Sequence, residues 1–64
     1  MKLKDVFEGY AIILAKNLRK FGTNCFVERF INDEDDAIYN AQSLTRCDGI
    51  LYYAYDCKAR KIIF

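Results

Sequence analysis

Apolar side chains recur at helical spacing between residues 5 and 21, in the stretch DVFEGYAIILAKNLRKF. One stripe along this stretch contains Phe7, Tyr10, Ala11, Leu14, Leu18 and Phe21, with Val6 and Ile13 on its flank. Asp5 and Glu8 suit a first turn, because their carboxylates accept hydrogen bonds from N–H groups that have no other partner there. The pattern predicts a core-facing helix over residues 5–21 that ends at Gly22.

The rest of the chain predicts a strand, a second helix and two further strands. Residues 25–31, CFVERFI, are β-branched and aromatic, as strands prefer. The four acidic residues 33–36 indicate a helix start, where carboxylates meet free N–H groups and the positive end of the helix dipole. This helix is expected to run to about Arg46, and the segments ILYYAYD and RKIIF then form two strands. The inward side chains of the helix are expected to be Ala37, Ile38, Ala41 and Leu44.

Together these segments predict an α+β fold in a single small domain, residues 1–64, with the element order α-β-α-β-β. The two helices are expected to pack on one face of a three-stranded sheet. Residues 62–64 are apolar on both sides, which slightly favours the last strand as the central one. A domain of this length buries only about 60% of the surface that its unfolded chain exposes, so its stability is marginal.

A sheet that is covered on one face leaves its other face open, which makes the tyrosines of residues 50–56 a candidate contact surface. The two alternating sets are Ile50, Tyr52 and Ala54 on one side and Leu51, Tyr53 and Tyr55 on the other. The open face therefore carries either Tyr52 or the pair Tyr53 and Tyr55. Tyrosine supplies a large contact area at low entropic cost, so we predict a protein-binding surface there. The alternative is that these are ordinary surface tyrosines.

Three further residues are candidates for protein binding. Ile12 lies on the polar face of the first expected helix, and Gly9, nearly one turn before it, permits close approach of a partner to the backbone. Tyr39 lies on the second expected helix, away from its inward stripe. Each of these residues is also compatible with an ordinary exposed position.

Nucleic-acid binding is the alternative function, because basic residues lie next to the aromatic segments. The candidates form two clusters: Lys16, Arg19 and Lys20 near the end of the first helix, and Lys58, Arg60 and Lys61 at the hairpin. Ten basic residues are offset by nine acidic ones, which leaves a net charge of +1. Phosphate-binding proteins usually carry a larger positive surplus, so nucleic acid is the less favoured partner. Any such binding is expected to be non-specific and sensitive to salt.

The side chains that most enzymes use are missing from this chain. It has no histidine, and Ser43 is its only serine. The acidic run at 33–36 suggests calcium, but the loop positions that require glycine and glutamate hold Ile38 and Leu44. We therefore expect a non-catalytic protein that carries neither a metal nor a cofactor.

Cysteine usage and hydropathy indicate where the protein resides. Cys25, Cys47 and Cys57 form no CxxC pair, and their odd number argues against a disulfide framework. We expect all three thiols to stay reduced and at least two to be buried. The longest apolar runs, Tyr10 to Ala15 and Ile50 to Tyr55, are far shorter than the roughly 20 residues that span a bilayer. The first residues show no secretory signal, so a cytoplasmic location is expected.

These observations favour a small protein-binding module without catalytic activity. In general character the chain resembles the small inhibitors and adaptors encoded by phages and mobile elements, including anti-CRISPR and anti-restriction proteins. The resemblance rests on the length of 64 residues, the aromatic content of 16% and the missing catalytic residues. It implies a protein that covers a surface of its partner. We expect a protein partner of unknown identity, which includes the possibility of a homodimer, and no membrane.

Overall fold

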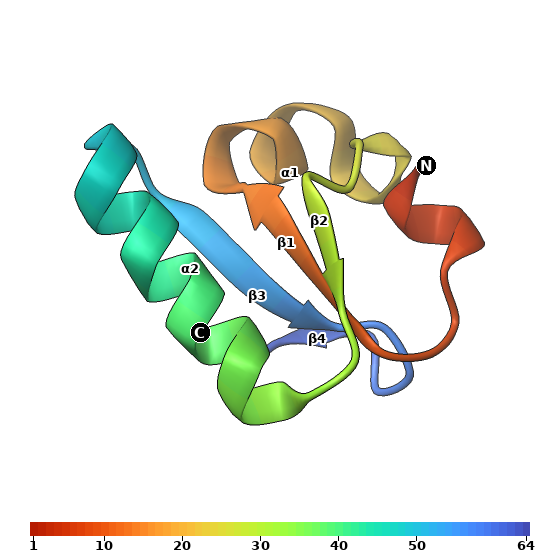
Figure 1. The fold of residues 1–64 in the computed structure, drawn as a ribbon. Coiled ribbons are helices and arrows are strands. Elements are labelled where there is room, and N and C mark those ends of the chain that lie inside the picture. Colours follow the sequence, from red (N-terminus) through yellow and green to blue (C-terminus); the bar gives the residue numbers. More distant parts are fainter.

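The computed structural model describes all 64 residues and shows an antiparallel sheet with a helix on each face (Figure 1). In chain order the elements are the short 3₁₀ helix η1 (Leu3–Asp5), β1 (Tyr10–Leu14), α1 (Ala15–Phe21), the 3₁₀ helix η2 (Gly22–Asn24), β2 (Arg29–Ile31), α2 (Glu34–Asp48), β3 (Tyr52–Asp56) and β4 (Lys61–Ile62). The strands are arranged in the order β2-β1-β3-β4. β1 and β3 are therefore the central strands, and β2 and β4 form the two edges.

The sheet separates two hydrophobic clusters, because consecutive side chains of a strand point to opposite faces. In β1, Ala11 and Ile13 belong to the first cluster and Ile12 belongs to the second, and none of the three has any exposed surface. The first cluster also contains Leu3, Val6, Cys25, Tyr55 and Cys57, and the second contains Ala37, Ala41, Tyr52 and Ala54. The N-terminal segment and α1 cover the first cluster, and α2 covers the second (Figure 1).

The helix predicted for residues 5–21 is wrong in its first part and confirmed in its last. Residues 10–14 form β1, and α1 begins only at Ala15. A strand that is buried on both faces has a continuous apolar run, and this run also satisfied the helical spacing. The adjacent β-branched residues Ile12 and Ile13 favour the strand. Gly22 follows the helix as predicted, and its N–H donates to the carbonyl of Leu18.

The second predicted helix is confirmed as α2. Asp33 is its N-cap, and the Asp33 carboxylate accepts a 3.1 Å hydrogen bond from the N–H of Asp36. Gly49 ends the helix at a φ of 72°, a conformation that glycine adopts without steric cost. Ala37 and Ala41 are fully buried, and their small side chains let α2 lie close to the sheet. Neither α2 nor the shorter α1 combines the length and the apolar composition needed to cross a membrane.

The α+β class is confirmed, but the sheet differs from the expected one in three ways. It has four strands rather than three, because residues 10–14 add a strand at its centre. β4 lies at an edge, so the central position expected for the last strand is wrong. The helices cover opposite faces rather than the same face, which leaves neither face of the sheet open.

Candidate functional site

The tyrosines of β3 lie inside the protein. Tyr52 and Tyr55 point to opposite faces of the sheet, yet the side of the sheet on which each lies is covered, and each residue is only 7% exposed. Tyr53 is half-buried. Tyr52 packs in the cluster beneath α2, whereas Tyr55 packs in the cluster beneath the N-terminal segment. The uncovered tyrosine face expected from the sequence is therefore absent, because each face of the sheet has its own cover.

The buried hydroxyl of Tyr52 has a hydrogen-bonding partner at the end of α2. It donates a 2.6 Å hydrogen bond to Oδ2 of Asp48, and the N–H of Tyr52 donates to Oγ1 of Thr45 at 3.0 Å. The hydrogen bond to this carboxylate, together with burial, raises the pKa of Tyr52 above its usual value. These bonds tie the start of β3 to the last turns of α2, which gives Tyr52 a structural role.

The other three protein-binding candidates have different environments. Ile12 is completely buried, so its expected exposure is wrong. Gly9 does allow a close approach, but the approaching group is the ring of Phe30 from the same chain. Tyr39 is exposed over 69% of its surface on α2, as predicted. Of this set, only Tyr39 presents a large apolar side chain to solvent.

The basic residues that the sequence analysis selected do not form one patch. All are exposed, in two groups: Lys16, Arg19 and Lys20 on α1, and Lys58, Arg60 and Lys61 around the turn between β3 and β4. α1 adjoins the start of β3, where the N–H of Ala15 donates to the carbonyl of Leu51, whereas the turn follows the end of β3. The two groups therefore lie at opposite ends of a central strand.

Arg60 is held by contacts within the protein. Its Nη1 donates a 2.7 Å hydrogen bond to the carbonyl of Val6. Its guanidinium lies 5.7 Å from the centroid of the Phe7 ring and 5.8 Å from that of Tyr55, which places both rings within cation–π range. Arg60 also adopts a φ of 61°, in the left-handed region. These contacts join the β3–β4 turn to the segment before β1 and hold Phe7 in position.

All five phenylalanines of the protein lie at the surface, namely Phe7, Phe21, Phe26, Phe30 and Phe64. Their exposed fractions range from 41% for Phe64 to 68% for Phe7. Both hydrophobic clusters are built without phenylalanine, mainly from alanine, isoleucine, cysteine and tyrosine. A small protein gains little folding free energy from apolar rings that stay in water, which makes the exposed phenylalanines candidates for a contact surface.

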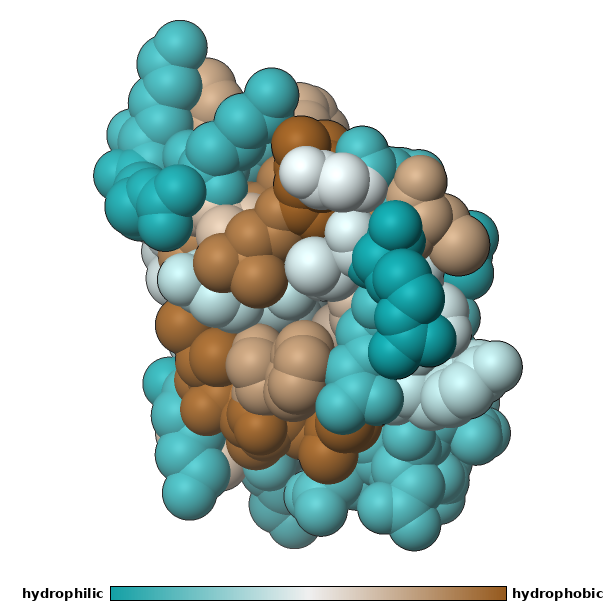
Figure 2. Space-filling model, turned by 90° about the vertical axis from the view of Figure 1, so that its left-hand side faces the viewer, coloured by the Kyte–Doolittle hydropathy of each residue, from teal (hydrophilic) through white to brown (hydrophobic).

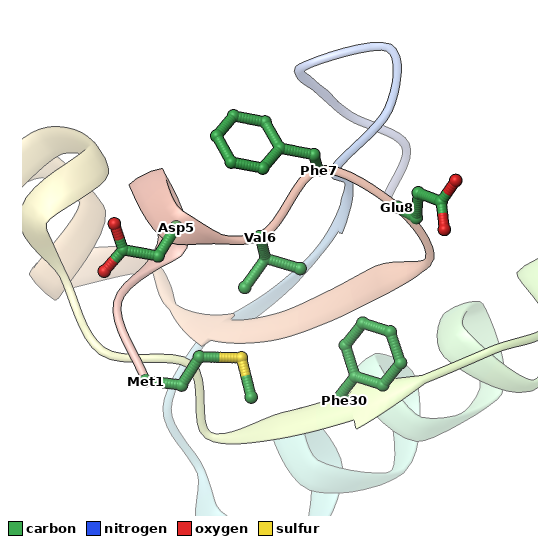
Figure 3. A pocket seen from close by; sticks show the side chains of 6 residues that line it. All are labelled: Met1, Asp5, Val6, Phe7, Glu8 and Phe30. Carbon is green, nitrogen blue, oxygen red and sulfur yellow. The ribbon is translucent and has the colours of Figure 1, made fainter.

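Two of these rings line the larger of the two hollows in the surface, which we call the aromatic hollow (Figure 3). It has a volume of about 530 Å³ and is lined by Met1, Asp5, Val6, Phe7, Glu8 and Phe30. Val6 lies between the rings of Phe7 and Phe30, and the carboxylates of Asp5 and Glu8 stand at opposite ends (Figure 3). An apolar surface between two carboxylates suits an apolar group that carries positive charge beside it.

The second hollow has the opposite charge. It measures about 190 Å³ and is lined by Leu14, Ala15, Lys16, Arg19, Ile50 and Leu51. Ile50 and Leu51 follow α2 and remain 44% and 45% exposed. Figure 2 views the side of the molecule on which α2 and the C-terminus lie, and it shows apolar atoms gathered in a band between polar ones. Apolar surface therefore extends beyond the aromatic hollow.

The thiols offer no reactive centre within the protein core. Cys25 and Cys57 are buried and Cys47 is exposed, which confirms that at least two thiols are buried. Burial raises the pKa of Cys25 and of Cys57, although the charge of Arg60 partly opposes this effect at Cys57. A raised pKa keeps a thiol protonated and unreactive near neutral pH. No three side chains of Cys, Asp or Glu are grouped so that they could hold a metal ion.

Comparison with known proteins gives no relative from which a function could be transferred. No family model, no curated protein and no solved structure matches the chain. The surface itself must therefore indicate what the protein does. Its most unusual property is the outward placement of the phenylalanines, and the aromatic hollow is where two of them meet.

Proposed function

We propose that this protein is a small non-catalytic protein-binding module, which acts as an inhibitor or adaptor by covering a surface of its partner. The exposure of all five phenylalanines supports this proposal most directly. Large aromatic side chains that stay outside the core of a small domain are the usual anchors of protein interfaces.

The free energy available from covering these rings is large for a protein of this size. Complete burial of a phenylalanine side chain is worth roughly 1.5–3 kcal/mol relative to exposure. Phe7 is still 68% exposed and Phe30 is 42% exposed, so a partner that covers both gains a substantial part of that value for each ring. The folded chain alone does not gain this free energy, because it leaves these parts of the rings exposed.

The aromatic hollow is the proposed contact site, in place of the tyrosines of β3. Its apolar side chains come from two segments that are distant in sequence, the N-terminal segment with Met1, Val6 and Phe7 and the strand β2 with Phe30, so that the fold holds them together. Arg60 fixes the Phe7 ring by a cation–π contact, which lowers the entropic cost of using it as an anchor.

The proposed biological role is that of the small inhibitors and adaptors of phages and mobile elements, which the chain resembles in length and aromatic content. Such a role requires only a stable surface that covers part of another protein. The side-chain inventory is compatible with this role, since the chain has no histidine and a single serine.

Site-specific photo-crosslinking tests the proposal. Benzoylphenylalanine is introduced in place of Phe7, Phe30 or, as a matched control, Phe64, which lies just beyond the opposite edge strand. The proteins are irradiated in a lysate of the native host, and the products are separated and identified by mass spectrometry. We expect one discrete protein product from the positions of Phe7 and Phe30 and none from the position of Phe64.

The products distinguish the possible partners. A product with twice the mass of the chain identifies a second copy as the partner and a homodimer as the functional form. Crosslinks to nucleic acid alone, or equal products from all three positions, contradict the proposal.

Nucleic-acid binding is retained as a second candidate because α1 presents three exposed cations, Lys16, Arg19 and Lys20, on only seven residues. The burial of Tyr52 and Tyr55 weakens it, since base stacking on the sheet face is no longer available. Fluorescence anisotropy with labelled single-stranded and duplex DNA tests this candidate. Weak binding that is lost as salt rises fits a charge effect, whereas sequence-selective, sub-micromolar binding at physiological salt favours this candidate over the first.

A further inference from the structure

We infer that the outer edge of β2 and the adjoining aromatic hollow together bind an extended peptide segment, in which an apolar residue is flanked by lysine or arginine. This inference rests on the proposed protein-binding function and adds the chemistry of the partner. Three features of the structure carry it: the open backbone of Phe30, the position of the hollow beside it, and the distribution of acidic residues.

The backbone groups of Phe30 point away from the sheet. The N–H of Ala15 donates to the carbonyl of Leu51 and the N–H of Cys57 donates to the carbonyl of Gly9, so odd-numbered residues from 9 to 15 form their hydrogen bonds with β3. Ala11 is one of them, and Phe30 lies opposite Ala11 on the other side of β1. The N–H and C=O of Phe30 therefore face outward, because backbone groups alternate in direction along an antiparallel strand.

Next to the stretch before β2, this edge is already paired with the first residues of the same chain. The N–H of Leu3 donates to the carbonyl of Cys25, and the N–H of Val27 donates to the carbonyl of Met1. Lys2 and Phe26 thereby form an isolated antiparallel bridge. The first residues of the chain thus occupy the edge next to 25–27, whereas the edge at Phe30 is open.

An added strand places one side chain directly in the aromatic hollow. Residues opposite each other in a sheet project their side chains to the same face. The ring of Phe30 lines the hollow, so the side chain of the residue paired with Phe30 enters the hollow between Met1 and Phe7 (Figure 3). Its main-chain groups form two hydrogen bonds with Phe30. This is the recognition mode in which backbone bonds supply affinity and a pocket supplies specificity.

Charge selects the residues on either side of this anchor. Of the nine acidic residues, Asp5 and Glu8 line the hollow, Glu28 comes directly before β2, and Asp33 follows β2 by two residues. Glu34, Asp35 and Asp36 form the first turn of α2, which covers the other face of the sheet. The cations near these carboxylates are Lys2, Lys4, Arg29 and Arg60, whose guanidinium lies against Phe7. Two of them are engaged within the protein, because Nη1 of Arg29 donates to Oδ1 of Asn40 at 2.9 Å and Nη1 of Arg60 donates to the carbonyl of Val6 at 2.7 Å. The surplus of carboxylates attracts a basic segment and repels an acidic one.

The same distribution argues against a second copy as the occupant. Antiparallel pairing of β2 with β2 of another copy would bring Glu28 of each chain towards Asp33 of the other. Like charges on neighbouring strands are destabilising. A basic peptide segment avoids this repulsion and is attracted instead, because its cations lie near the carboxylates.

Fluorescence anisotropy with labelled peptides tests the inference. The probe is acetyl-Arg-Lys-Leu-Lys-Arg-amide with a fluorophore on an added terminal lysine. Three matched peptides each remove one feature: serine replaces leucine, glutamate replaces all four basic residues, or the leucine nitrogen is methylated so that it cannot donate to the carbonyl of Phe30. We expect saturable binding of the probe, weakened at least about tenfold by each change and weakened further as salt screens the charges.

Variants of the protein complete the experiment. Phe30→Ser and the double change Asp5→Lys with Glu8→Lys should each weaken binding of the probe at least about tenfold. Phe64→Ser, a matched replacement at the opposite edge of the sheet, where the Phe64 backbone bonds to Ala54 of β3, should leave it unchanged. Circular dichroism confirms that each variant is folded, and Phe30→Leu replaces Phe30→Ser if the serine variant does not fold.

Each outcome either supports or overturns the inference. Equal binding of the N-methylated peptide excludes strand addition, and equal binding of the acidic peptide excludes the role of charge. A concentration-dependent dimer that Phe30→Ser abolishes identifies a second copy as the occupant and overturns the basic peptide. Failure of every peptide, together with a protein crosslink from the positions of Phe7 and Phe30, overturns this inference but leaves the proposed function standing.

Discussion

A Cβ atom on Gly9 would lie 2.5 Å from Cζ of Phe30, so the absence of a side chain at Gly9 lets the aromatic ring close over the backbone just before β1. Gly9 also has a φ of 73°, a conformation that residues with a side chain rarely adopt. The position therefore needs glycine for two independent reasons. One concerns the backbone alone, and the other concerns the shape of the aromatic hollow.

Gly9→Ala should destabilise the protein through both effects. The left-handed backbone costs about 1–2 kcal/mol for a residue with a Cβ atom, and the Phe30 ring must also move away. In a Phe30→Ala background the clash with the ring is removed, and only the backbone cost and the 3.3 Å contact with the carbonyl oxygen of Ile31 remain, so Gly9→Ala should be less harmful there. Urea unfolding of the four proteins in this cycle measures the difference. Equal costs in both backgrounds would show that the ring is not packed on Gly9.

Ile12→Ala should be among the most damaging single substitutions in the protein. Ile12 is fully buried at the centre of the second cluster, and large-to-small changes at such sites cost about 2–5 kcal/mol. Natural domains have only roughly 0.05–0.15 kcal/mol of stability per residue, which is about 3–10 kcal/mol for 64 residues, so the variant should lose a large part of its stability.

The milder change Ile12→Val, at about 0.5–1.5 kcal/mol, keeps the test quantitative. Tyr39→Ala is the control, because Tyr39 is 69% exposed and its loss should change stability by no more than about 0.5 kcal/mol. Thermal unfolding followed by circular dichroism compares the three variants. A harmless Ile12→Ala would restore the helical reading of residues 5–21, in which Ile12 faces water.

The periodicity of apolar residues predicted correctly those helices and strands whose sequence pattern fits only one kind of element. The helix 34–48 carries an acidic first turn and a stripe based on Ala37 and Ala41, which together fit no strand. The run YAIIL fits two structures, because a strand that is buried on both faces and a short segment of a buried helix can both be apolar at every position. The choice between them depends on pairing with 29–31 and 52–56, which are distant in sequence.

That single ambiguity also explains the errors at the candidate site. When residues 10–14 are assigned to a helix, the predicted sheet lacks its central strand. One face of that predicted sheet is then open and exposes tyrosines of β3. Phe7 was placed in the core for the same reason, whereas it is 68% exposed. The aromatic hollow forms only when β1 and β2 pair and bring Phe30 towards Met1 and Val6. No local sequence pattern predicts that arrangement.

Titration of the phenols should show a late ionisation that belongs to Tyr10 and Tyr52. The pKa of Tyr52 is raised chiefly by its hydrogen bond to Asp48, and that of Tyr10 is raised chiefly by burial and then by the charge of Glu34. Absorbance near 295 nm should therefore show late ionisation of these two groups out of five tyrosines.

The raised pKa of Tyr52 has a defined consequence for stability. The folded state holds the phenol proton more tightly than the unfolded chain, whose pKa is about 10. The resulting stabilisation is complete below about pH 10 and is lost as pH rises through the higher folded-state pKa. Tyr52→Phe should be less stable at neutral pH and should show a shallower loss of stability above about pH 10. An unchanged slope would assign the loss to other groups.

Thiol labelling should reveal one fast cysteine and two slow ones. Cys47 is exposed, whereas Cys25 and Cys57 are buried and their raised pKa disfavours the reactive thiolate. A bulky thiol reagent added to native protein should label Cys47 within minutes and the other two only after urea is added. Cys47→Ser should remove the fast phase. Rapid labelling of all three thiols in the native protein would contradict the burial of Cys25 and Cys57.

The position of β3 at the centre of the sheet also determines when the protein can fold during synthesis. β1 forms early in the chain, but its principal partner consists of residues 52–56, and both hydrophobic clusters need side chains from β3. A nascent chain on the ribosome therefore cannot complete the second cluster until Ala54 has left the exit tunnel, or the first cluster until Cys57 has left it. Until then, apolar residues such as Ile12 and Ile13 have no partner. Pairing over such a long sequence separation is slow, which prolongs the time for which these apolar side chains stay exposed.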